Sequence, residues 1–261
     1  MKLNQKPKII SISNQKGGVG KTTTAVNLAT ALAAINKKVL VLDLDPQGNA
    51  TVSFGVDRKN VPKNMYQVLM GAETLSSAIV WTQIPNLSVV ASSRNLAGVD
   101  HELSFQDSPQ FFLKKAIEQS QLSYDYIFID CPPAVGMLTV NALVASDSVI
   151  VPVQCEYLAL EGVADLMKTI ERVKKNFNPS LELQGILLTM FDGRTGLSEV
   201  VAQDVCGYFG SKVYKSVIPR NVRVSEAPSH GKPILLYDFK SKGAQAYINL
   251  AKEVLKQEKK K

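Results

Sequence analysis

The residues with the clearest capacity for chemistry lie in a glycine-rich segment at positions 16–23, KGGVGKTT. An apolar run at 9–13 precedes this segment and a helix-like stretch begins at Lys21, so the context is strand, loop and helix, as a phosphate cradle requires. Glycines allow backbone N–H groups to turn towards a phosphate, and the start of the helix adds partial positive charge. Lys21 would then reach the β- and γ-phosphate oxygens, and the Thr22 hydroxyl would bind Mg²⁺. We therefore expect a loop that binds ATP or ADP with magnesium, and its residues are Gln15, Lys16, Gly17, Gly18, Val19, Gly20, Lys21, Thr22 and Thr23.

The loop departs from the ordinary pattern G-x-x-x-x-G-K-[ST] at its first position. Gln15 stands where that pattern has glycine, and Lys16 follows it. A lysine at the mouth of its own loop is poorly placed to reach its own γ-phosphate and well placed to reach a nucleotide on a facing subunit. Lys16 is therefore a candidate catalytic residue that acts across a subunit interface, and the alternative is an exposed surface charge.

Three aspartates lie at the ends of two apolar runs. Asp43 and Asp45 are two positions apart, and because side chains alternate along a strand, both should face the phosphate loop at the strand's carboxyl end. Asp130 ends a second apolar run, at 126–130. Asp43, through water, and Asp130 are therefore expected beside Mg²⁺ together with Thr22. Asp45 precedes a proline, so its alternative role is to initiate a turn.

The rest of the chain alternates between short apolar runs and longer amphipathic segments, the pattern of parallel strands covered by crossover helices. Residues 48–81 mix turn residues with short apolar pieces and give no clear element. The fold class is therefore α/β: a P-loop NTPase with a mostly parallel twisted sheet and helices on both faces. We expect one domain over residues 1–261, without an N-terminal helix-turn-helix. Expected strands cover residues 9–13, 39–43, 87–91, 126–130, 148–153, 185–190 and 213–218, and expected helices cover 21–34, 110–119, 160–177, 199–209 and 244–256.

Positive charge is concentrated at the end of the chain. The formal net charge is +7, yet residues 1–214 carry 19 Lys and Arg against 19 Asp and Glu, whereas residues 215–261 carry 11 against 4. This asymmetry indicates an acidic partner such as nucleic acid or a membrane surface. For the last three lysines, Lys259, Lys260 and Lys261, a solvated tail is the simpler interpretation.

Membrane, secretory and metal-cluster classes receive no support from the composition. No apolar run is long enough for a membrane span, and the run at 9–12 is too brief for a signal peptide, so we expect a cytoplasmic protein. The three cysteines, Cys131, Cys155 and Cys206, are odd in number and lack CxxC spacing, which argues against a disulfide framework or a zinc site. We expect them to be buried thiols.

Four blocks in order along the chain resemble the ParA/MinD family of deviant Walker A ATPases, and within it the Soj-type (ParA) partitioning proteins. They are KGGVGKTT at 16–23, DLDPQGN at 43–49, DCPP at 130–133, and IPRNVR at 218–223 followed by SEAPS at 225–229. The resemblance covers nearly the whole chain.

That resemblance implies an ATP-bound sandwich dimer in which Lys16 contacts the partner's nucleotide and hydrolysis resets the dimer. It implies that Asp45 positions the attacking water, so that Lys16, Lys21 and Asp45 are the catalytic set. Pro219 and Asn221 match positions that line the adenine pocket in relatives. The implied activity is weak ATP hydrolysis, stimulated by a partner.

The same resemblance implies partners and a place in the cell. The dimer would bind double-stranded DNA nonspecifically on the nucleoid and work with a ParB-type centromere-binding protein to segregate a chromosome or plasmid. Arg194 and Arg223 resemble the DNA-contacting arginines of Soj-type relatives, and both lie in polar, turn-like segments. The alternative is that they pair with Asp192 and Glu226 and serve stability alone.

Three other functions remain open from the sequence. A MinD-like membrane-positioning ATPase needs a C-terminal amphipathic helix, but the apolar positions 250, 251, 254 and 255 suit packing on the core. An ATPase resembling the nitrogenase iron protein needs a cysteine pair at a subunit interface, a pattern that Cys131 and Cys155 lack. An amidoligase or synthetase needs a substrate pocket that the sequence does not identify.

Overall fold

In the part of the chain that this computed structural model describes, residues 6–157 and 159–258, seven strands form one sheet in the order β3-β4-β2-β5-β1-β6-β7. Neighbouring strands are parallel except β3 and β4, which are antiparallel at one edge. This confirms the expected mostly parallel sheet. The strands are β1 (Lys8–Ile12), β2 (Val39–Asp43), β3 (Ile79–Trp81), β4 (Leu87–Val90), β5 (Tyr126–Asp130), β6 (Ser148–Gln154) and β7 (Glu182–Thr189).

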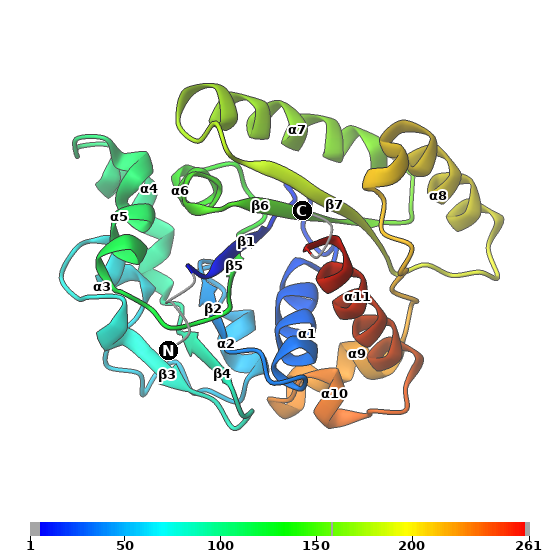
Figure 1. Ribbon diagram of the computed structural model, residues 1–261, viewed down its shortest axis with the longest axis horizontal. Coiled ribbons are helices and arrows are strands. Elements are labelled where there is room, and N and C mark those ends of the chain that lie inside the picture. Colours follow the sequence, from blue (N-terminus) through cyan, green and yellow to red (C-terminus); the bar gives the residue numbers. More distant parts are fainter. Residues whose placement is uncertain (1–5, 158, 259–261) are drawn as a thin grey trace.

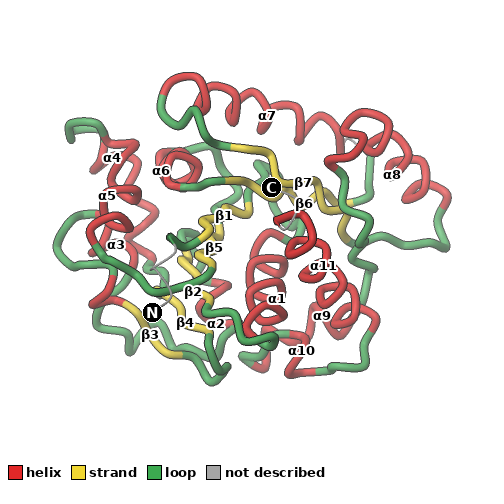
Figure 2. Tube along the Cα trace, in the orientation of Figure 1, coloured by secondary structure: helices red, strands yellow, loops and turns green. Residues whose placement is uncertain are grey.

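Helices cover both faces of the sheet, as Figure 1 shows, and Figure 2 shows the strands passing between them. On one face, α1 and α11 pack against Ile10, Val41 and Phe128. On the other face, α3, α5 and α6 pack against β2 and β5, and α7 and α8 pack against β6 and β7. The helices are α1 (Lys21–Ala33), α2 (Asn49–Ser53), α3 (Met65–Leu69), α4 (Val99–Leu103), α5 (Phe112–Gln119), α6 (Met137–Ala145), α7 (Ala159–Asn176), α8 (Gly196–Phe209), α9 (Val222–Glu226), α10 (Ile234–Tyr237) and α11 (Lys242–Glu258).

The central strands form because their sequences suit burial on two faces. Every residue of β2, VLVLD, and of β5, YIFID, is buried. Such continuous apolar runs are typical of parallel strands with helices on both sides. By contrast, α7 is amphipathic: it buries Val163, Leu166, Ile170 and Val173 at helical spacing and exposes charged residues on its other side. Within the described ranges, no helix combines the length and the apolar character needed to span a bilayer.

The strand predicted at 213–218 is wrong. This segment runs beside β7 but forms only isolated bridges among the described residues. Val213 bridges to Ile186 of β7, and the next residue after the segment, Pro219, bridges to Phe191, which follows β7 closely. Between the bridges, the backbone N–H groups of Lys215 and Ser216 donate to the Glu253 carboxylate of α11 at 2.8 and 2.9 Å. A helix side chain therefore takes the donors that a continuous ladder would need.

The seventh strand is instead β3, which lies in the stretch where no element was clear from the sequence. It has three residues and pairs only with β4, so it is too short for its periodicity to be recognised. The remaining predicted strands correspond to β1, β2, β4, β5, β6 and β7, with small shifts at their ends. Lys259, Lys260 and Lys261 lie outside the described residues.

Candidate functional site

Three adjacent parallel strands bring the expected site residues together at their carboxyl ends. In the sheet, β5 lies between β2 and β1, and Asp130 is in register with both Asp43 and Ile12. The loop that follows β1 carries the glycine-rich segment into α1. Residues far apart in sequence therefore meet at one edge of the sheet, where ligands bind in open α/β folds.

The backbone of the glycine-rich loop requires glycine at two positions. Gly18 and Gly20 have φ of 75° and 89°, in the left-handed region that side chains disfavour. The Thr189 hydroxyl, at the end of β7, donates to the Val19 carbonyl at 2.9 Å and supports the loop from behind. Gly20 is the N-cap of α1, and no side chain caps that helix. The first N–H groups of α1 are thus available to an anion, as phosphate binding requires.

Lys21 is nearly buried, with 6% of its surface exposed. Its ammonium group donates to the Lys16 carbonyl at 2.9 Å, within the same loop. Burial lowers the pKa of Lys21, while the Asp130 carboxylate and then Cys131 and Asp45 act to raise it. Opposite charge nearby offsets part of the cost of burying this cation.

Asp130 is the most unusual carboxylate of the site. It is fully buried, and among the described residues neither of its side-chain oxygens makes a hydrogen bond of ordinary geometry, although the Thr22 hydroxyl lies near enough to favour its charged form. Burial, and then the charge of Asp43, raise the pKa of Asp130 well above its ordinary value, while Thr22 and Lys21 act in the opposite direction. A buried carboxylate normally has a partner, so a bound cation would suit this position. Like Asp43, however, Asp130 does not line the cavity described below, and its contact with magnesium stays a prediction.

The oxygen donors at this position fit Mg²⁺. Asp130 and the nearby Thr22 hydroxyl supply oxygen, which magnesium prefers. Among the described residues, no group of three or more His, Cys, Asp or Glu side chains could hold a metal by itself. Phosphate oxygens and water would therefore have to complete the shell, as is usual for Mg²⁺ in nucleotide sites.

Asp43 has a different environment from the one expected. Its carboxylate accepts hydrogen bonds from the Thr51 N–H and hydroxyl at 2.8 and 2.6 Å and from the Asp45 N–H at 3.3 Å. Burial raises the pKa of Asp43 to about 6, and the Thr51 hydrogen bonds act to lower it. Asp43 therefore supports α2 and does not line the cavity described below, so its contact with magnesium through water stays a prediction.

Asp45 forms the turn considered from the sequence, and its role in hydrolysis stays a prediction. It lines the cavity and is 7% exposed. Its side chain accepts from the Gln47 N–H at 2.9 Å, and its carbonyl accepts from the Gly48 N–H at 2.8 Å, which closes a turn. The aspartate thus begins a turn and is also one of the residues that line the cavity.

A cavity of about 410 Å³ extends from the phosphate loop between α1, α2 and the segment at 224–234. The far wall is apolar and was not predicted from the sequence, although Ala227 and Pro228 of the SEAPS block belong to it. Met190, with φ of 51°, also lines the cavity, and such backbone strain often accompanies functional sites. The apolar wall consists of Val52, Val224, Ala227, Pro228, Pro233 and Ile234.

Pro219 and Asn221, the residues expected at adenine, do not line this cavity. Asn221 accepts a hydrogen bond from the Arg223 N–H at 2.9 Å and is the N-cap of α9. Pro219 bridges to Phe191 and lines a separate surface hollow beside it. A proline and an asparagine at the start of a short helix are sufficient to explain this local backbone.

Lys16 is directed away from the phosphate position. Its side chain is 39% exposed and forms an ion pair with Glu156, between β6 and α7. It is not among the residues that line the cavity. The two lysines of the loop therefore differ: Lys21 is buried beside the acidic residues, and Lys16 lies at the surface.

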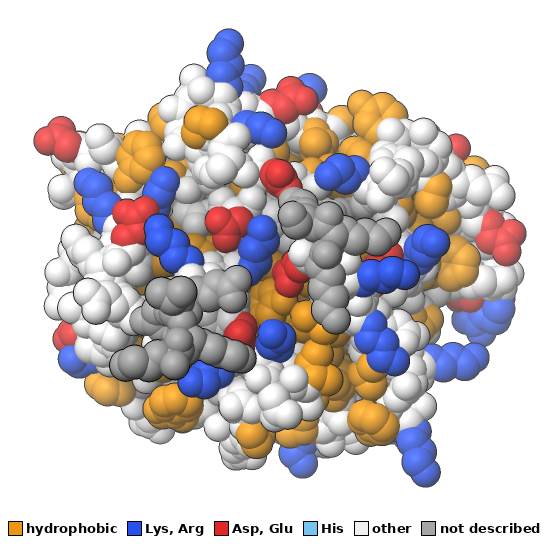
Figure 3. Space-filling view, viewed as in Figure 1, with side chains coloured by type: hydrophobic (Ala, Val, Ile, Leu, Met, Phe, Trp, Pro, Cys, Tyr) orange, Lys and Arg blue, Asp and Glu red, His pale blue; other side chains and the backbone are white. Residues whose placement is uncertain are grey.

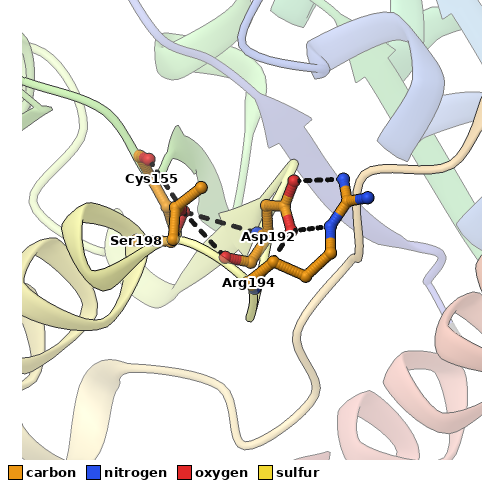
Figure 4. A network of polar contacts seen from close by, with 5 residues as sticks. Cys155, Asp192, Arg194 and Ser198 are labelled. Atoms are coloured by element: carbon orange, nitrogen blue, oxygen red, sulfur yellow. Dashed lines mark hydrogen bonds and ion pairs between the residues drawn. The ribbon is translucent and has the colours of Figure 1, made fainter.

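The two arginines expected to bind DNA both pair with the acids considered as their alternative partners. Arg194 makes a two-pronged contact with Asp192, at 2.8 and 2.7 Å, in the loop before α8 (Figure 4). Its side chain nevertheless remains 87% exposed. Arg223 lies in α9, not in a loop, and pairs with Glu226 at 3.0 Å and with Asp238 at 3.7 Å. Arg194 is the more accessible of the two.

Two of the three cysteines are buried thiols, as expected, and the third is exposed. Cys131 and Cys155 are buried, whereas Cys206 is exposed on α8. Burial raises the pKa of Cys131, and it raises the pKa of Cys155 to about 11. The prediction for Cys206 was wrong because neighbours on the same helix, such as Val201 and Val205, take the buried face.

Comparison with known proteins gives consistent matches. Residues 7–183 match a family model described as an AAA domain. A sporulation initiation inhibitor protein Soj from Bacillus subtilis (strain 168) is 54% identical, with 95% of this chain and 98% of the relative covered. A chromosome partitioning protein ParA from Caulobacter vibrioides (strain NA1000 / CB15N) is 52% identical over 97% of this chain and 95% of the relative.

The chain is also similar to the solved structure of a protein that is named as a synthase and not as a partitioning protein. A cobyrinic acid a,c-diamide synthase from Mycobacterium smegmatis, with a bound ATP analogue and magnesium, is 37% identical. It has a TM-score of 0.86, and the match covers 97% of this chain and 96% of that one. That protein therefore shares the fold and binds, at its own site, the ligand classes that the present loop was expected to bind.

Proposed function

Since the chain belongs to the ParA/Soj family of partitioning ATPases, we propose that it is an ATP-dependent DNA-partitioning ATPase. In this proposal, an ATP-bound sandwich dimer binds DNA nonspecifically, and slow hydrolysis, stimulated by a centromere-binding protein of ParB type, resets it. The observation that carries the proposal is the contrast between two lysines of one loop. Lys21 is buried beside Asp130, while Lys16 lies at the surface and outside its own cavity.

The chain's own residues bind and orient the triphosphate. The uncapped N-terminus of α1 and the glycine amides bind the phosphates, and Lys21 leaves the Lys16 carbonyl to contact the β- and γ-phosphates. Thr22 and Asp130 would hold Mg²⁺, which neutralises charge on the transferring group when it is bound. Asp45 orients the attacking water, because among the described residues it is the only acidic one that lines the cavity. Together these groups favour water attack on the γ-phosphorus.

Dimerisation supplies Lys16 to the partner's nucleotide. To reach it, the Lys16 ammonium must leave Glu156, a half-exposed ion pair of the kind that contributes little to stability. Light scattering after size-exclusion chromatography, with a nonhydrolysable ATP analogue, tests this step. Wild type should run as a dimer and Lys16→Ala as a monomer that still binds nucleotide. A full dimer of Lys16→Ala would show that the lysine is not needed in trans.

Binding to DNA would use phosphate contacts. Arg194 is 87% exposed, and its contact with Asp192 uses only one edge of the guanidinium, so other N–H groups remain for a phosphate. The excess of basic residues after position 214 adds attraction that is independent of base sequence. This supports location on the nucleoid.

The reaction can be tested by measuring ATP turnover under four conditions: the protein alone, with duplex DNA, with a ParB-type protein, and with both. We expect weak turnover alone and a clear increase when both additions are present. Turnover that neither addition changes would contradict a partner-stimulated cycle.

A membrane-positioning function has less support. The apolar residues of α11, including Leu250, Ala251 and Val254, are buried against the sheet and α1. Within the described residues, this helix therefore keeps no broad apolar face for a lipid surface. Sedimentation with anionic liposomes should leave the protein in the supernatant with either nucleotide.

The similarity to a diamide synthase motivates one control. That structure is 37% identical, compared with 52–54% for the relatives named for partitioning or as Soj. Incubation with ATP, glutamine and cobyrinic acid should give no amidated product. Formation of that product would favour the synthetase function over the partitioning one.

A further inference from the structure

The turn that carries Asp45 is held by residues that do not themselves line the cavity. Asp45 and Gln47 both line the cavity. The turn is closed by the Gly48 N–H, which donates to the Asp45 carbonyl at 2.8 Å, and the Ser92 hydroxyl donates to the same carbonyl. The carbonyls of the two intervening peptides, those of Pro46 and Gln47, need another donor.

Arg58 provides that donor. Its Nη1 donates to the Pro46 carbonyl at 3.1 Å and also to the Gln47 carbonyl. The side chain is half-buried, and it takes part in none of the ion pairs formed within the described ranges. A charged guanidinium whose hydrogen bonds within the described ranges go to carbonyl oxygens orients those peptides strongly, because charge-assisted hydrogen bonds are stronger than neutral ones.

These contacts act on Asp45 through one peptide unit. In a trans peptide, C=O and N–H point in opposite directions. The peptide whose carbonyl faces Arg58 is the one whose N–H, that of Gln47, donates to the Asp45 carboxylate at 2.9 Å. Arg58 therefore binds the carbonyl group of this peptide, and the N–H group of the same peptide binds one carboxylate oxygen of Asp45. The two hydrogen bonds polarise each other.

Because Gly48 has no side chain, it leaves space for the guanidinium group of Arg58. At φ of 70°, a Cβ on this residue would lie 2.4 Å from Nη1 and 3.0 Å from Cδ of Arg58. The arginine thus packs directly on the glycine backbone, and any side chain at position 48 would displace it. The sequence reason for glycine here is therefore both the left-handed backbone and this contact.

We propose that Arg58 is a positioning residue for ATP hydrolysis, holding the turn at 45–48 so that the Asp45 carboxylate faces the attacking water. This role rests on the proposed function, because it assigns to Asp45 the orientation of water. Arg58 itself does not line the cavity and should not contribute to nucleotide affinity. Its effect should therefore fall on turnover alone.

The test compares Arg58→Ala with Lys59→Ala, which removes the same charge from the next residue, an exposed lysine. In Arg58→Ala, kcat should fall about 10- to 100-fold, the size expected when a reacting group is displaced by about 1 Å. The dissociation constant for ATP should stay within about twofold of wild type, and Lys59→Ala should match wild type in both. Arg58→Lys should recover part of the loss, since one ammonium can still reach a carbonyl.

Two results would overturn the role. One is an unchanged kcat in Arg58→Ala. The other is a parallel loss of kcat, ATP affinity and urea midpoint, which would indicate general loosening and not positioning. Wild-type protein that hydrolyses no ATP would refute the proposed function itself, and this role with it; an active wild type with normal Arg58→Ala refutes this role alone.

Discussion

Lys21 has only 6% of its surface exposed, so its neighbours hold the side chain in place. Its ammonium group donates to the loop carbonyl of Lys16, and the carboxylates of Asp130 and Asp45 favour its charged form. Such a cation is ready to exchange a carbonyl for phosphate oxygens with little movement, which lowers the entropic cost of binding.

Lys21→Ala should therefore lose nucleotide binding. Each charge-assisted hydrogen bond contributes about 1.5–3 kcal/mol, so we expect affinity for ATP to fall at least about tenfold and by about 100-fold if two are removed. Calorimetry with ATP and magnesium measures this change. Lys37→Ala, at a surface ion pair with Asp125, is the matched control and should bind as wild type does. Equal affinity of the two variants would refute the loop assignment.

Asp45→Ala should separate binding from hydrolysis. The residue lines the cavity but lies in a turn outside the phosphate loop, so ATP should bind and the dimer should form. Groups that assist proton transfer or orient the nucleophile contribute about 100- to 10,000-fold, and we expect kcat to fall within that range. Single-turnover hydrolysis measures it directly. A variant with wild-type turnover would leave Asp45 with its turn-forming role alone.

Residue types and spacing were sufficient for the phosphate loop, because the motif and its strand–loop–helix context are local. They were not sufficient for Asp43, whose carboxylate is taken by Thr51 eight positions later on a helix of only five residues. Nor could they reveal Arg58, which acts through carbonyl groups that no side-chain pattern records. Thr51 and Arg58 both lie between residues 48 and 81, and their contacts with the site depend on how the short segments of this stretch fold back onto it.

Among the elements, those that were predicted best are buried on two faces, such as β2 and β5. The helix α6, MLTVNALVA, was missed because it is apolar on nearly every side and shows no amphipathic period. The segment at 213–218 looked like a strand, and only the tertiary contact with Glu253 decides otherwise. Local pattern thus fails where an element has no polar face or where a helix side chain competes for its backbone.

The packing of α2 against the loop before α10 can be tested by substitution. Gly231 has φ of 61°, and a Cβ there would lie 3.0 Å from the Cα of Gly55, which follows α2. Two segments that line the nucleotide cavity thus meet through glycine backbones. Their packing leaves no room for a methyl group.

Gly231→Ala should destabilise the fold by about 1–3 kcal/mol, from the left-handed backbone and the close contact together. Gly207→Ala is the matched control, because Gly207 lies within α8 and a Cβ there meets no atom within 4 Å. That change should be neutral or stabilise by about 0.5–1 kcal/mol. Urea unfolding of both variants measures the difference, and equal midpoints would contradict the described packing.

For the whole molecule, charge is distributed unevenly along the chain, with 11 Lys and Arg against 4 Asp and Glu in residues 215–261. Several Lys and Arg side chains lie on the side that carries α8, α9 and α11, with acidic residues among them (Figure 3). Arg194, in the loop before α8, and Arg223, in α9, are each partly neutralised by an acid. Net attraction to DNA must then come from many moderate contacts, which makes binding steep in salt.

Arg194→Ala should weaken DNA binding by the ATP-bound dimer and reduce the slope of log affinity against log salt by about one for each DNA phosphate that the arginine neutralises in wild type. Arg223→Ala should have a smaller effect, because Glu226 and Asp238 hold that side chain. Arg172→Ala, an exposed arginine of α7, is the control. Fluorescence anisotropy over a salt series measures the slopes, and wild-type slopes in both variants would move the DNA surface to the basic C-terminal region.

Nucleotide control of nonspecific DNA binding is the property on which the proposed function depends most directly. A gel mobility shift with one nonspecific duplex, performed with a nonhydrolysable ATP analogue, with ADP and without nucleotide, measures it. We predict a shift only with the ATP analogue, and a much weaker shift in Lys21→Ala at the same analogue concentration, because its affinity for nucleotide is reduced at least about tenfold. A shift of equal strength in all three conditions, or none in any, would contradict a switch in which ATP builds the DNA-binding dimer.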